Sequence, residues 1–311
     1  MTSTVLVTGA AGIAGAHVAE ALRAAGESVV PVSREPRDGW ATADLRDASA
    51  VAGLPPFDAI VHCAALTPRS GELDRAAYQS ANVETTSILA AEAARRRVQR
   101  FVFVSTMGRP EQQDDRPGRY YIASKREAEQ RLAKAGAGRF AVWILRAASL
   151  YGEYDRGSMA TLIGAVARGR LIAIGDLGHR KCLLYAGSLG ALIASEIETG
   201  ATSGLRSEAV HDLDIHRFAD VLSAVERAVG RRAPRLPVPA AIARAGIRAG
   251  RATADAVGMH RAARLLGAAT VALRDVPCDG ENALGRVRGQ AVALDEGVRR
   301  EVAWLRADGR I

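Results

Sequence analysis

Short apolar runs alternate with helical patterns through the first half of this 311-residue chain. Each run has the length and the continuous apolar character of a strand that is buried on both faces. The candidate strands are residues 4–9, 28–33, 59–65, 100–106 and 141–152. Helical spacing of apolar residues covers 16–26, 72–97 and 121–136. Strands that alternate with helices predict βαβ units and an α/β fold with a doubly wound parallel sheet. Pro31 is awkward for a central strand, because proline has no N–H to donate to a neighbour.

The second half of the chain is patterned mainly as helices. Residues 158–169 form one helical pattern, which Gly169 closes, and residues 216–230 form a strongly amphipathic one. Residues 181–200 have the pattern of a short strand followed by a helix. These segments predict a smaller, mostly helical lobe beyond the sheet.

Composition excludes several classes of protein. A hydrophobic content of 48% is that of an ordinary globular chain. We expect neither a signal peptide nor a membrane span, because the N-terminus has no basic region and no apolar run reaches about 18 residues. The net charge of +8 is spread along the chain and aromatics are only 5%, so we expect an arginine-rich surface and no nucleic-acid partner.

The cysteines suggest a compartment. Cys63, Cys182 and Cys278 are odd in number and far apart in the sequence. This spacing indicates neither a disulfide framework nor a metal site, which is typical of a protein in the reducing cytoplasm. We therefore expect a cytoplasmic protein that holds no metal.

A glycine-rich turn joins the first predicted strand to the first predicted helix. In "VTGAAGIAG", Gly9, Gly12 and Gly15 have the spacing G-x-x-G-x-x-G. Glycines allow a tight turn, let backbone N–H groups approach a pyrophosphate, and aim the helix N-terminus at its charge. We therefore expect a Rossmann-like dinucleotide-binding domain at residues 1–152, to which 181–200 returns. Residues 153–180 and 201–311 would then form a substrate-binding lobe.

The end of the second predicted strand indicates which dinucleotide binds. An acidic residue there would accept a bond from the ribose of NAD, but this strand ends with Ser33 and Arg34. A hydroxyl followed by a guanidinium suits a 2′-phosphate, so NADP is favoured over NAD. The alternative is that Arg34 is an ordinary solvated charge.

A tyrosine and a lysine are placed for proton transfer. The chain has 42 Lys plus Arg, yet only three are lysines, and one of these, Lys125, follows Tyr121 by four residues. That spacing puts both side chains on one helix face. An ammonium near a phenol lowers the pKa of the phenol, so Tyr121 could exchange a proton with a carbonyl or alcohol while a nicotinamide exchanges hydride.

These motifs together resemble the extended short-chain dehydrogenase/reductase family, of the NAD-dependent epimerase/dehydratase type. "ADLRD", "VHCAALT", "SANVETT" and "FVFVSTMG" are similar to further motifs of that family. The resemblance implies that Thr106, with Ser105 as the second choice, holds the substrate oxygen beside Tyr121 and Lys125. The cofactor contacts that it implies are Gly9, Gly12, Ile13, Ala14, Gly15, Ser33, Arg34, Asp44, Leu45, Cys63, Ala64, Ala65, Asn82, Tyr121, Lys125 and Ala148.

The resemblance also implies a substrate side, where the chain departs from the family pattern. "LRAASLYGE" has Ala147 in place of the usual proline, and Ser188 stands where the family has an aspartate. In nucleotide-sugar enzymes Arg180 and Lys181 would face a diphosphate. The implied substrate contacts are Thr67, Thr106, Ser149, Arg180 and Lys181. Loops around 67–75, 107–118 and 149–185 would shape the pocket.

Four functions stay open from the sequence. The first is an NADP-dependent reductase of a keto group, most simply the 4-keto group of a nucleotide-linked sugar. The second is a nucleotide-sugar 4-epimerase with tightly bound NAD, and the third is a reductase of a non-sugar carbonyl. The fourth is a non-catalytic NADP sensor or scaffold on the same fold. Dehydration is disfavoured, because Met107 and Gly108 replace the Asp-Glu pair that is frequent in dehydratases. The resemblance further implies a homodimer through helices at 76–97 and 121–136.

Overall fold

The chain folds into two compact units, and each unit is built from three separate stretches of the sequence. The computed structural model describes residues 3–68, 74–108, 116–175, 177–199, 204–236, 238, 242, 245–246, 249–250, 253, 275–276 and 278–311. The first unit contains Met1–Asp155, Leu184–Leu213 and Asp279–Val292. The second contains Arg156–Leu183, Asp214–Cys278 and Ala293–Ile311. Of the loops expected to shape the pocket, residues 69–73, 109–115 and 176 lie outside the described part.

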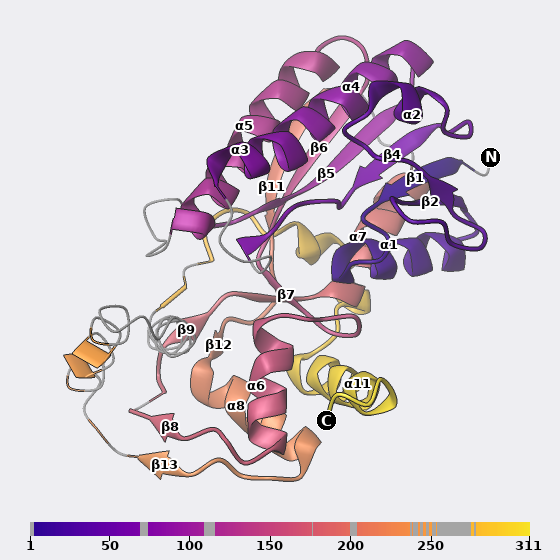
Figure 1. The fold of residues 1–311 in the computed structure, drawn as a ribbon. Helices are drawn as coiled ribbons and strands as arrows, with labels where there is room; N and C mark the ends of the chain where they lie inside the picture. Colours follow the sequence, from indigo (N-terminus) through magenta and orange to yellow (C-terminus); the bar gives the residue numbers. More distant parts are fainter. Residues whose placement is uncertain are drawn as a thin grey trace. The chain divides into compact units, whose positions relative to one another are not determined.

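A seven-stranded parallel sheet forms the centre of the first unit. Its strand order is β11-β6-β5-β4-β1-β2-β3, and each neighbouring pair is parallel (Figure 1). The strands are β1 (Thr4–Thr8), β2 (Ser28–Ser33), β3 (Ala41–Thr42), β4 (Ala59–His62), β5 (Arg100–Thr106), β6 (Ala141–Ala147) and β11 (Leu205–Val210). This is the doubly wound, Rossmann-like sheet that the alternating pattern predicted.

Helices cover both faces of that sheet. The elements are α1 (Ile13–Ala24), α2 (Ala48–Ala52), α3 (Arg75–Tyr78), the π-helical turn η2 (Gln79–Glu84), α4 (Thr85–Arg96), α5 (Arg116–Gly136) and α7 (Ala186–Glu198). Alternate residues of each strand face opposite layers. Val5 and Val7 pack in one core with α1 and α7, whereas Leu6 packs in the other core with α2, α4 and α5.

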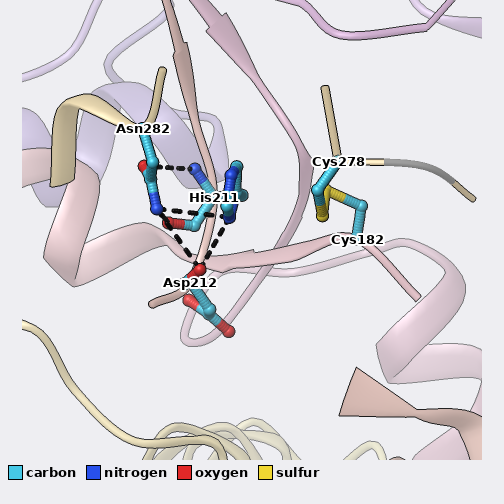
Figure 2. Close-up of a disulfide and its surroundings, with 5 residues drawn as sticks. All are labelled: Cys182, His211, Asp212, Cys278 and Asn282. Carbon is cyan, nitrogen blue, oxygen red and sulfur yellow. Dashed lines mark hydrogen bonds between the residues drawn. A yellow bond between two sulfur atoms is a disulfide. The ribbon is translucent and has the colours of Figure 1, made fainter. Parts of the chain in front are cut away.

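Two segments that the sequence pattern assigned to the substrate lobe belong instead to the first unit, which contains the sheet. Strand β11 pairs with β6, and the 3₁₀ helix η4 (Ala283–Gln290) packs on α7 and β11. Asn282 attaches η4 to the end of β11, because its side-chain amide hydrogen-bonds both the N–H and the carbonyl of His211, at 3.2 and 3.0 Å (Figure 2). The first half of β11 is exposed on its outer side, so it lacks the apolar run by which the other strands were recognised.

Pro31 fits the sheet because β3 is short. The residue lies opposite Val7 of β1, on one side of β2. On the other side β3 pairs only with Val32 and Ser33, so the third strand begins one residue beyond the proline. The missing N–H of Pro31 therefore leaves no gap in a central ladder.

The second unit is mostly helical, as the pattern predicted. Helices α6 (Ser158–Ala167), α8 (Phe218–Val229) and α11 (Leu294–Ala307) pack on one another. Two short pairs accompany them: β8 (Ala173–Ile174) lies parallel to β13 (Arg235–Leu236), and β9 (Arg180–Lys181) antiparallel to β12 (His216–Arg217). In the first unit, β7 (Ser149–Tyr151) pairs with β10 (Leu183–Tyr185), of which Leu184 and Tyr185 belong to that unit, in a further two-stranded sheet. Among the described residues, no helix combines the length and apolar character needed to cross a bilayer.

A disulfide in the second unit corrects the expectation drawn from the cysteines. Cys182 and Cys278 are bonded, with Cα atoms 5.4 Å apart, although 96 residues separate them in the sequence (Figure 2). The fold brings them together because residues 275–276 run beside β9. The Arg180 N–H donates to Asp275 at 2.6 Å, and the Val276 N–H donates to the Arg180 carbonyl at 2.9 Å. Cys63 is a free cysteine.

Removal of this disulfide should destabilise the protein. A cross-link across a loop of this length stabilises a fold by about 2–5 kcal/mol, chiefly through the unfolded chain. We expect Cys278→Ser to lower the free energy of unfolding by that amount in chemical denaturation without reductant. Wild type with reductant should match the variant, whose own stability should not respond to reductant. Titration of three thiols in unreduced, denatured wild type would contradict the assignment.

Candidate active site

The glycine loop leaves the N-terminus of α1 open. Gly9 has φ of +68°, and a Cβ there would lie 2.6 Å from the Ala64 nitrogen; a Cβ on Gly15 would lie 2.3 Å from the Gly9 carbonyl oxygen. Packing therefore requires both glycines. At Gly12 a Cβ would meet the Gly9 oxygen at an ordinary 3.4 Å, so packing alone does not demand that glycine. Gly12 is also the N-cap of α1 and supplies no side-chain cap. The free N–H groups of Ile13 and Ala14 at this helix start fit a pyrophosphate, as expected of a dinucleotide site.

The predicted 2′-phosphate contacts lie at the end of β2. Arg34 is exposed, and the Ser33 hydroxyl accepts a hydrogen bond from the Glu35 N–H at 3.2 Å. Nearby, Asp44 accepts three bonds from the guanidinium of Arg46, the shortest at 2.6 Å. This pairing with Arg46, helped by the charge of Arg34, lowers the pKa of Asp44 to about 2. The carboxylate is thus ionised and Arg34 lies within its field, while Leu45 packs against the sheet core.

The loop after β4 is held by Asn82. The Asn82 Oδ1 accepts from the Leu66 N–H at 2.7 Å, and its Nδ2 donates to the Leu66 carbonyl at 3.1 Å and to the Ser124 hydroxyl at 2.9 Å. Both amide hydrogens are therefore committed to the protein. The Asn82 side chain fixes the loop that carries Cys63, Ala64, Ala65 and Thr67. The family resemblance had placed Asn82 among the cofactor contacts.

The surroundings of Cys63 disfavour its thiolate form. Burial raises the pKa of its thiol to about 12, although the nearby Lys125 charge opposes that shift. The thiol is protonated at neutral pH, and a protonated thiol is neither a good nucleophile nor a metal ligand. Cys63 therefore serves as a small apolar wall of this loop.

The last two residues of β5 have different surroundings. Ser105 is buried, and its hydroxyl donates to the carboxylate of Glu129 at 2.5 Å. Thr106 is half-buried, and its oxygen accepts from the Gly108 N–H at 3.2 Å, which does not use the hydroxyl hydrogen. Successive strand residues point to opposite faces, so only one of the two can face a substrate. This geometry favours Thr106 over Ser105 as the residue that contacts a carbonyl oxygen.

Lys125 is almost completely buried on α5. Its side chain is 1% exposed, and its Nζ lies 3.9 Å from the ring centroid of Phe103. Burial lowers the pKa of Lys125 to about 7, against the opposing effects of Cys63 and Glu129. Tyr121 lies one helical turn earlier and is half-buried, with its ring 6.5 Å from that of Tyr78. A lysine that titrates near neutral pH beside a tyrosine is suited to proton transfer.

Glu129 is a buried residue next to the candidate site that sequence reasoning missed. Its buried carboxylate accepts from Ser105, from Arg126 at 2.7 Å and from Arg146 of β6 at 2.7 Å. It thereby ties α5 to two strands of the sheet, four residues beyond Lys125. The available signal was the spacing, because Tyr121, Lys125 and Glu129 recur every fourth residue and so share a helix face.

The remaining candidates belong to two different units. Ala148 follows β6, the strand that neighbours β5, and its N–H donates to the Val210 carbonyl at 2.9 Å. Ser149 begins β7 and is exposed. Arg180 and Lys181 form β9 of the second unit, where Arg180 is exposed and burial lowers the pKa of Lys181 to about 8 despite Asp275.

One edge of the sheet gathers the candidate residues of the first unit. Parallel strands end at the same edge, and in this family of topologies ligands bind beyond the carboxyl ends of the strands. β1, β4, β5 and β6 are consecutive in the sheet. Their ends carry the glycine loop, the Asn82-held loop, Thr106 and Ala148, and α5 adds Tyr121 and Lys125. This arrangement fits a nicotinamide dinucleotide, with Tyr121 and Lys125 close to the same edge.

Comparison with known proteins identifies a curated relative and similar solved structures. The chain is similar to 4-hydroxy-2-methyl-3-oxo-4-farnesyl-3,4-dihydroquinoline-1-oxide ketoreductase of Stigmatella aurantiaca, with 32% identity over 158 residues. The match covers 46% of this chain and 47% of the relative, so the chain spans about half the length of that curated protein.

Solved structures share the fold across the whole chain. UDP-glucose 4-epimerase of Thermus thermophilus, in complex with NAD, has a TM-score of 0.68 at 23% identity, and the match covers 97% of this chain and 99% of that one. MoeE5, in complex with UDP-glucose and NAD, has a TM-score of 0.69 at 22% identity, with coverage of 98% and 99%. The model of the NAD dependent epimerase/dehydratase family matches residues 5–199, which include the glycine loop, Thr106, Tyr121 and Lys125. The chain therefore belongs to the NAD dependent epimerase/dehydratase family.

Proposed function

We propose that this protein is an NADP-dependent oxidoreductase that reduces a keto group, in the simplest case the 4-keto group of a nucleotide-linked sugar. The observation that carries the proposal is the buried Lys125, one helical turn from Tyr121 on α5. A fold excludes an ammonium from water only at a considerable free-energy cost. A role in proton transfer explains why a chain rich in arginine keeps a lysine there.

Each side chain has a distinct task in the proposed reaction. A bound reduced nicotinamide supplies the hydride. Tyr121 donates its phenolic proton to the carbonyl oxygen of the substrate, and the Thr106 hydroxyl hydrogen-bonds the same oxygen. As the phenolate forms, the protonated amine of Lys125 stabilises its negative charge, and a proton from solvent then restores the phenol. Ser105 and Glu129 act one step away, by fixing α5 against β5.

NADP is the favoured cofactor because of Ser33 and Arg34. Arg34 is exposed and close enough to Asp44 to act on its ionisation, so its guanidinium is available at the adenine end of the site. The similar solved structures hold NAD, which keeps NAD as the alternative. A cofactor that is released after each reduction would suit net reduction, whereas a permanently bound NAD would suit epimerisation.

Two substrate classes have support. The name of the MoeE5 complex includes UDP-glucose, and Arg180 and Lys181 could pair with a diphosphate as in nucleotide-sugar enzymes. The curated relative, in contrast, is named as the ketoreductase of a farnesylated quinoline oxide, which favours a non-sugar ketone. Ser188, where the family pattern has an aspartate, is completely buried and accepts from the Val292 N–H at 3.0 Å, so it stabilises the fold. A panel containing both keto-sugar nucleotides and aromatic ketones would separate the classes.

An epimerase or a non-catalytic scaffold with the same residues would behave differently from a reductase. An epimerase would retain NAD through purification, which its absorbance would reveal, and would show no net consumption of NADPH. A sensor or scaffold would bind NADP without turnover of any carbonyl. The presence of Tyr121, Lys125 and Thr106 together argues for catalysis.

The proposal also includes an oligomeric state and a cellular compartment. We propose a homodimer through α4 and α5, whose outward residues include Ala91, Arg95, Ala123, Arg131 and Lys134. We keep the cytoplasm as the compartment, because an NADPH-dependent reductase depends on its cofactor pool. The cysteines no longer support that location, since Cys182 and Cys278 are bonded.

Cofactor choice should depend on Arg34. Loss of charge-assisted bonds to a 2′-phosphate should weaken NADPH binding to Arg34→Ala by about 10- to 100-fold and leave NADH binding unchanged. Fluorescence titration with both dinucleotides measures this. Arg37→Ala is the matched control, because Arg37 lies in the same exposed loop with its guanidinium 5.1 Å from the ring of Trp40. Tight binding of NADH by wild type, with no response to Arg34→Ala, would assign NAD instead.

Turnover should depend on Tyr121. Tyr121→Phe removes the proton donor and should lower kcat by about 10²- to 10⁴-fold on whichever carbonyl of the panel is reduced, with little change in the dinucleotide Kd. Tyr120→Phe, the neighbouring residue on the same helix, should keep the wild-type kcat. Near-full turnover by Tyr121→Phe would remove this tyrosine from the mechanism.

Stability should depend on pH through Lys125. Below its folded pKa of about 7, Lys125 is protonated in both states; between 7 and 10.5 the unfolded chain keeps the proton and the folded protein does not. The free energy of unfolding should therefore rise with pH in that interval, by at most about 1.4 kcal/mol per pH unit from this group. Lys125→Met should remove this slope in denaturation at pH 7 and 9, and Lys134→Met, exposed on the same helix, should retain it. An equal slope in both variants would contradict the lowered pKa.

A further inference from the structure

Three buried side chains of the first unit, Thr8, His62 and Thr86, are hydrogen-bonded in series, and we call them the Thr8–His62–Thr86 chain. His62, the last residue of β4, is completely buried, as are Thr8 of β1 and Thr86 of α4. The Nδ1 of His62 lies 2.6 Å from the Thr8 hydroxyl, and its Nε2 lies 3.0 Å from the Thr86 hydroxyl. The two ends of the chain are the Ala64 N–H, 3.3 Å from the Thr8 oxygen, and the Asn82 carbonyl, 2.6 Å from the Thr86 oxygen.

For a neutral imidazole, these contacts fix the direction of every hydrogen bond. A backbone carbonyl only accepts, so the Thr86 hydroxyl donates to Asn82 and must accept from Nε2–H of His62. Nδ1 then carries no hydrogen and accepts from the Thr8 hydroxyl, whose oxygen accepts the Ala64 N–H. The result is a neutral imidazole in one tautomer within a directional chain. Burial, together with the charge of Lys125, holds the pKa of His62 well below its usual range, which agrees with the neutral form.

The chain fixes the loop after β4 at a second point. Asn82 holds Leu66 of that loop through its side chain, and the Thr8–His62–Thr86 chain connects Ala64 of the same loop to the backbone of Asn82. Ala64 is also the residue against which Gly9 packs, at a distance that no Cβ could occupy. Loop and glycine turn are thus set relative to one another without a ligand.

We propose that His62 is a positioning residue for the dinucleotide, which acts by setting the spacing between the glycine turn and the loop of residues 63–67. The inference rests on the proposed function in one respect, namely that the dinucleotide lies across these two loops. His62 itself contacts neither substrate nor reacting atoms. Thr86 is connected to the loop through the imidazole of His62, so we expect a substitution of Thr86 to weaken the hydrogen bonding of the Ala64 N–H.

Thr86→Val is the test, because it removes one hydroxyl without changing the side-chain volume. The variant leaves the Nε2–H of His62 without its acceptor and removes one donor from the Asn82 carbonyl. Thr85→Val is the matched control: Thr85 is the adjacent residue of α4, is also buried, and its hydroxyl bonds the Ser80 carbonyl of the same helical run at 3.3 Å. Both variants should lower Tm, so Tm alone cannot distinguish positioning from stability.

Two measurements distinguish a positioning role of this hydrogen-bonded chain from a purely stabilising one. In the ligand-free protein, amide hydrogen exchange at Ala64 and Leu66 should be faster in Thr86→Val and as in wild type in Thr85→Val. The Kd of the preferred dinucleotide should rise about tenfold in Thr86→Val and stay unchanged in Thr85→Val. Unchanged exchange and Kd in Thr86→Val would overturn the inference. If the wild type bound neither NADPH nor NADH, the proposed function would fail, and the exchange at Ala64 would still decide whether His62 positions the loop.

Discussion

Parallel strand pairing is the constraint on which the rest of this structure depends. Because β1, β4, β5 and β6 run in the same direction, their carboxyl ends meet at one edge of the sheet, and residues from four distant parts of the sequence meet there. The backbone must turn at that edge, and the glycine at position 9 makes one of these turns possible with its positive φ. Helix α1 then starts where the turn ends, which leaves its N–H groups directed at the same edge.

The site next to that edge is held in place by buried polar groups. Glu129 joins α5 to β5 and β6, and Asn82 joins the helix before α4 to the loop after β4 and to α5. Lys125 stands between these two anchors, in contact with the ring of Phe103. An ammonium in that position can keep a near-neutral pKa only if its surroundings do not relax around it. Asn82 and Glu129 each have hydrogen-bond partners on at least two elements, which hold α5 against the sheet and against the loop after β4.

Local patterns were sufficient to predict the nucleotide half of the molecule. The strand runs, the glycine spacing and the four-residue interval between Tyr121 and Lys125 are short-range features, and the structure contains the corresponding strands, turn and helix. Features that depend on distant partners were not predictable in the same way. β11 is an edge strand with an exposed half, so it has no continuous apolar run. Cys182 meets Cys278 through the neighbouring backbone of residues 275–276, and His62 acquires its role from hydroxyls on two other elements.

The edge strand β11 has a consequence for biosynthesis. The sheet unit is built from three separate stretches of the chain, and its last stretch, which carries η4, ends at Val292. On the ribosome, the first six strands of the sheet are available once residue 147 has emerged, but β11 and the helix that covers it arrive much later. Until then the outer side of β6 is an unpaired edge, of the kind that other chains can join. Throughout that interval of synthesis, a nascent chain of this protein carries a strand edge with which its neighbours can pair.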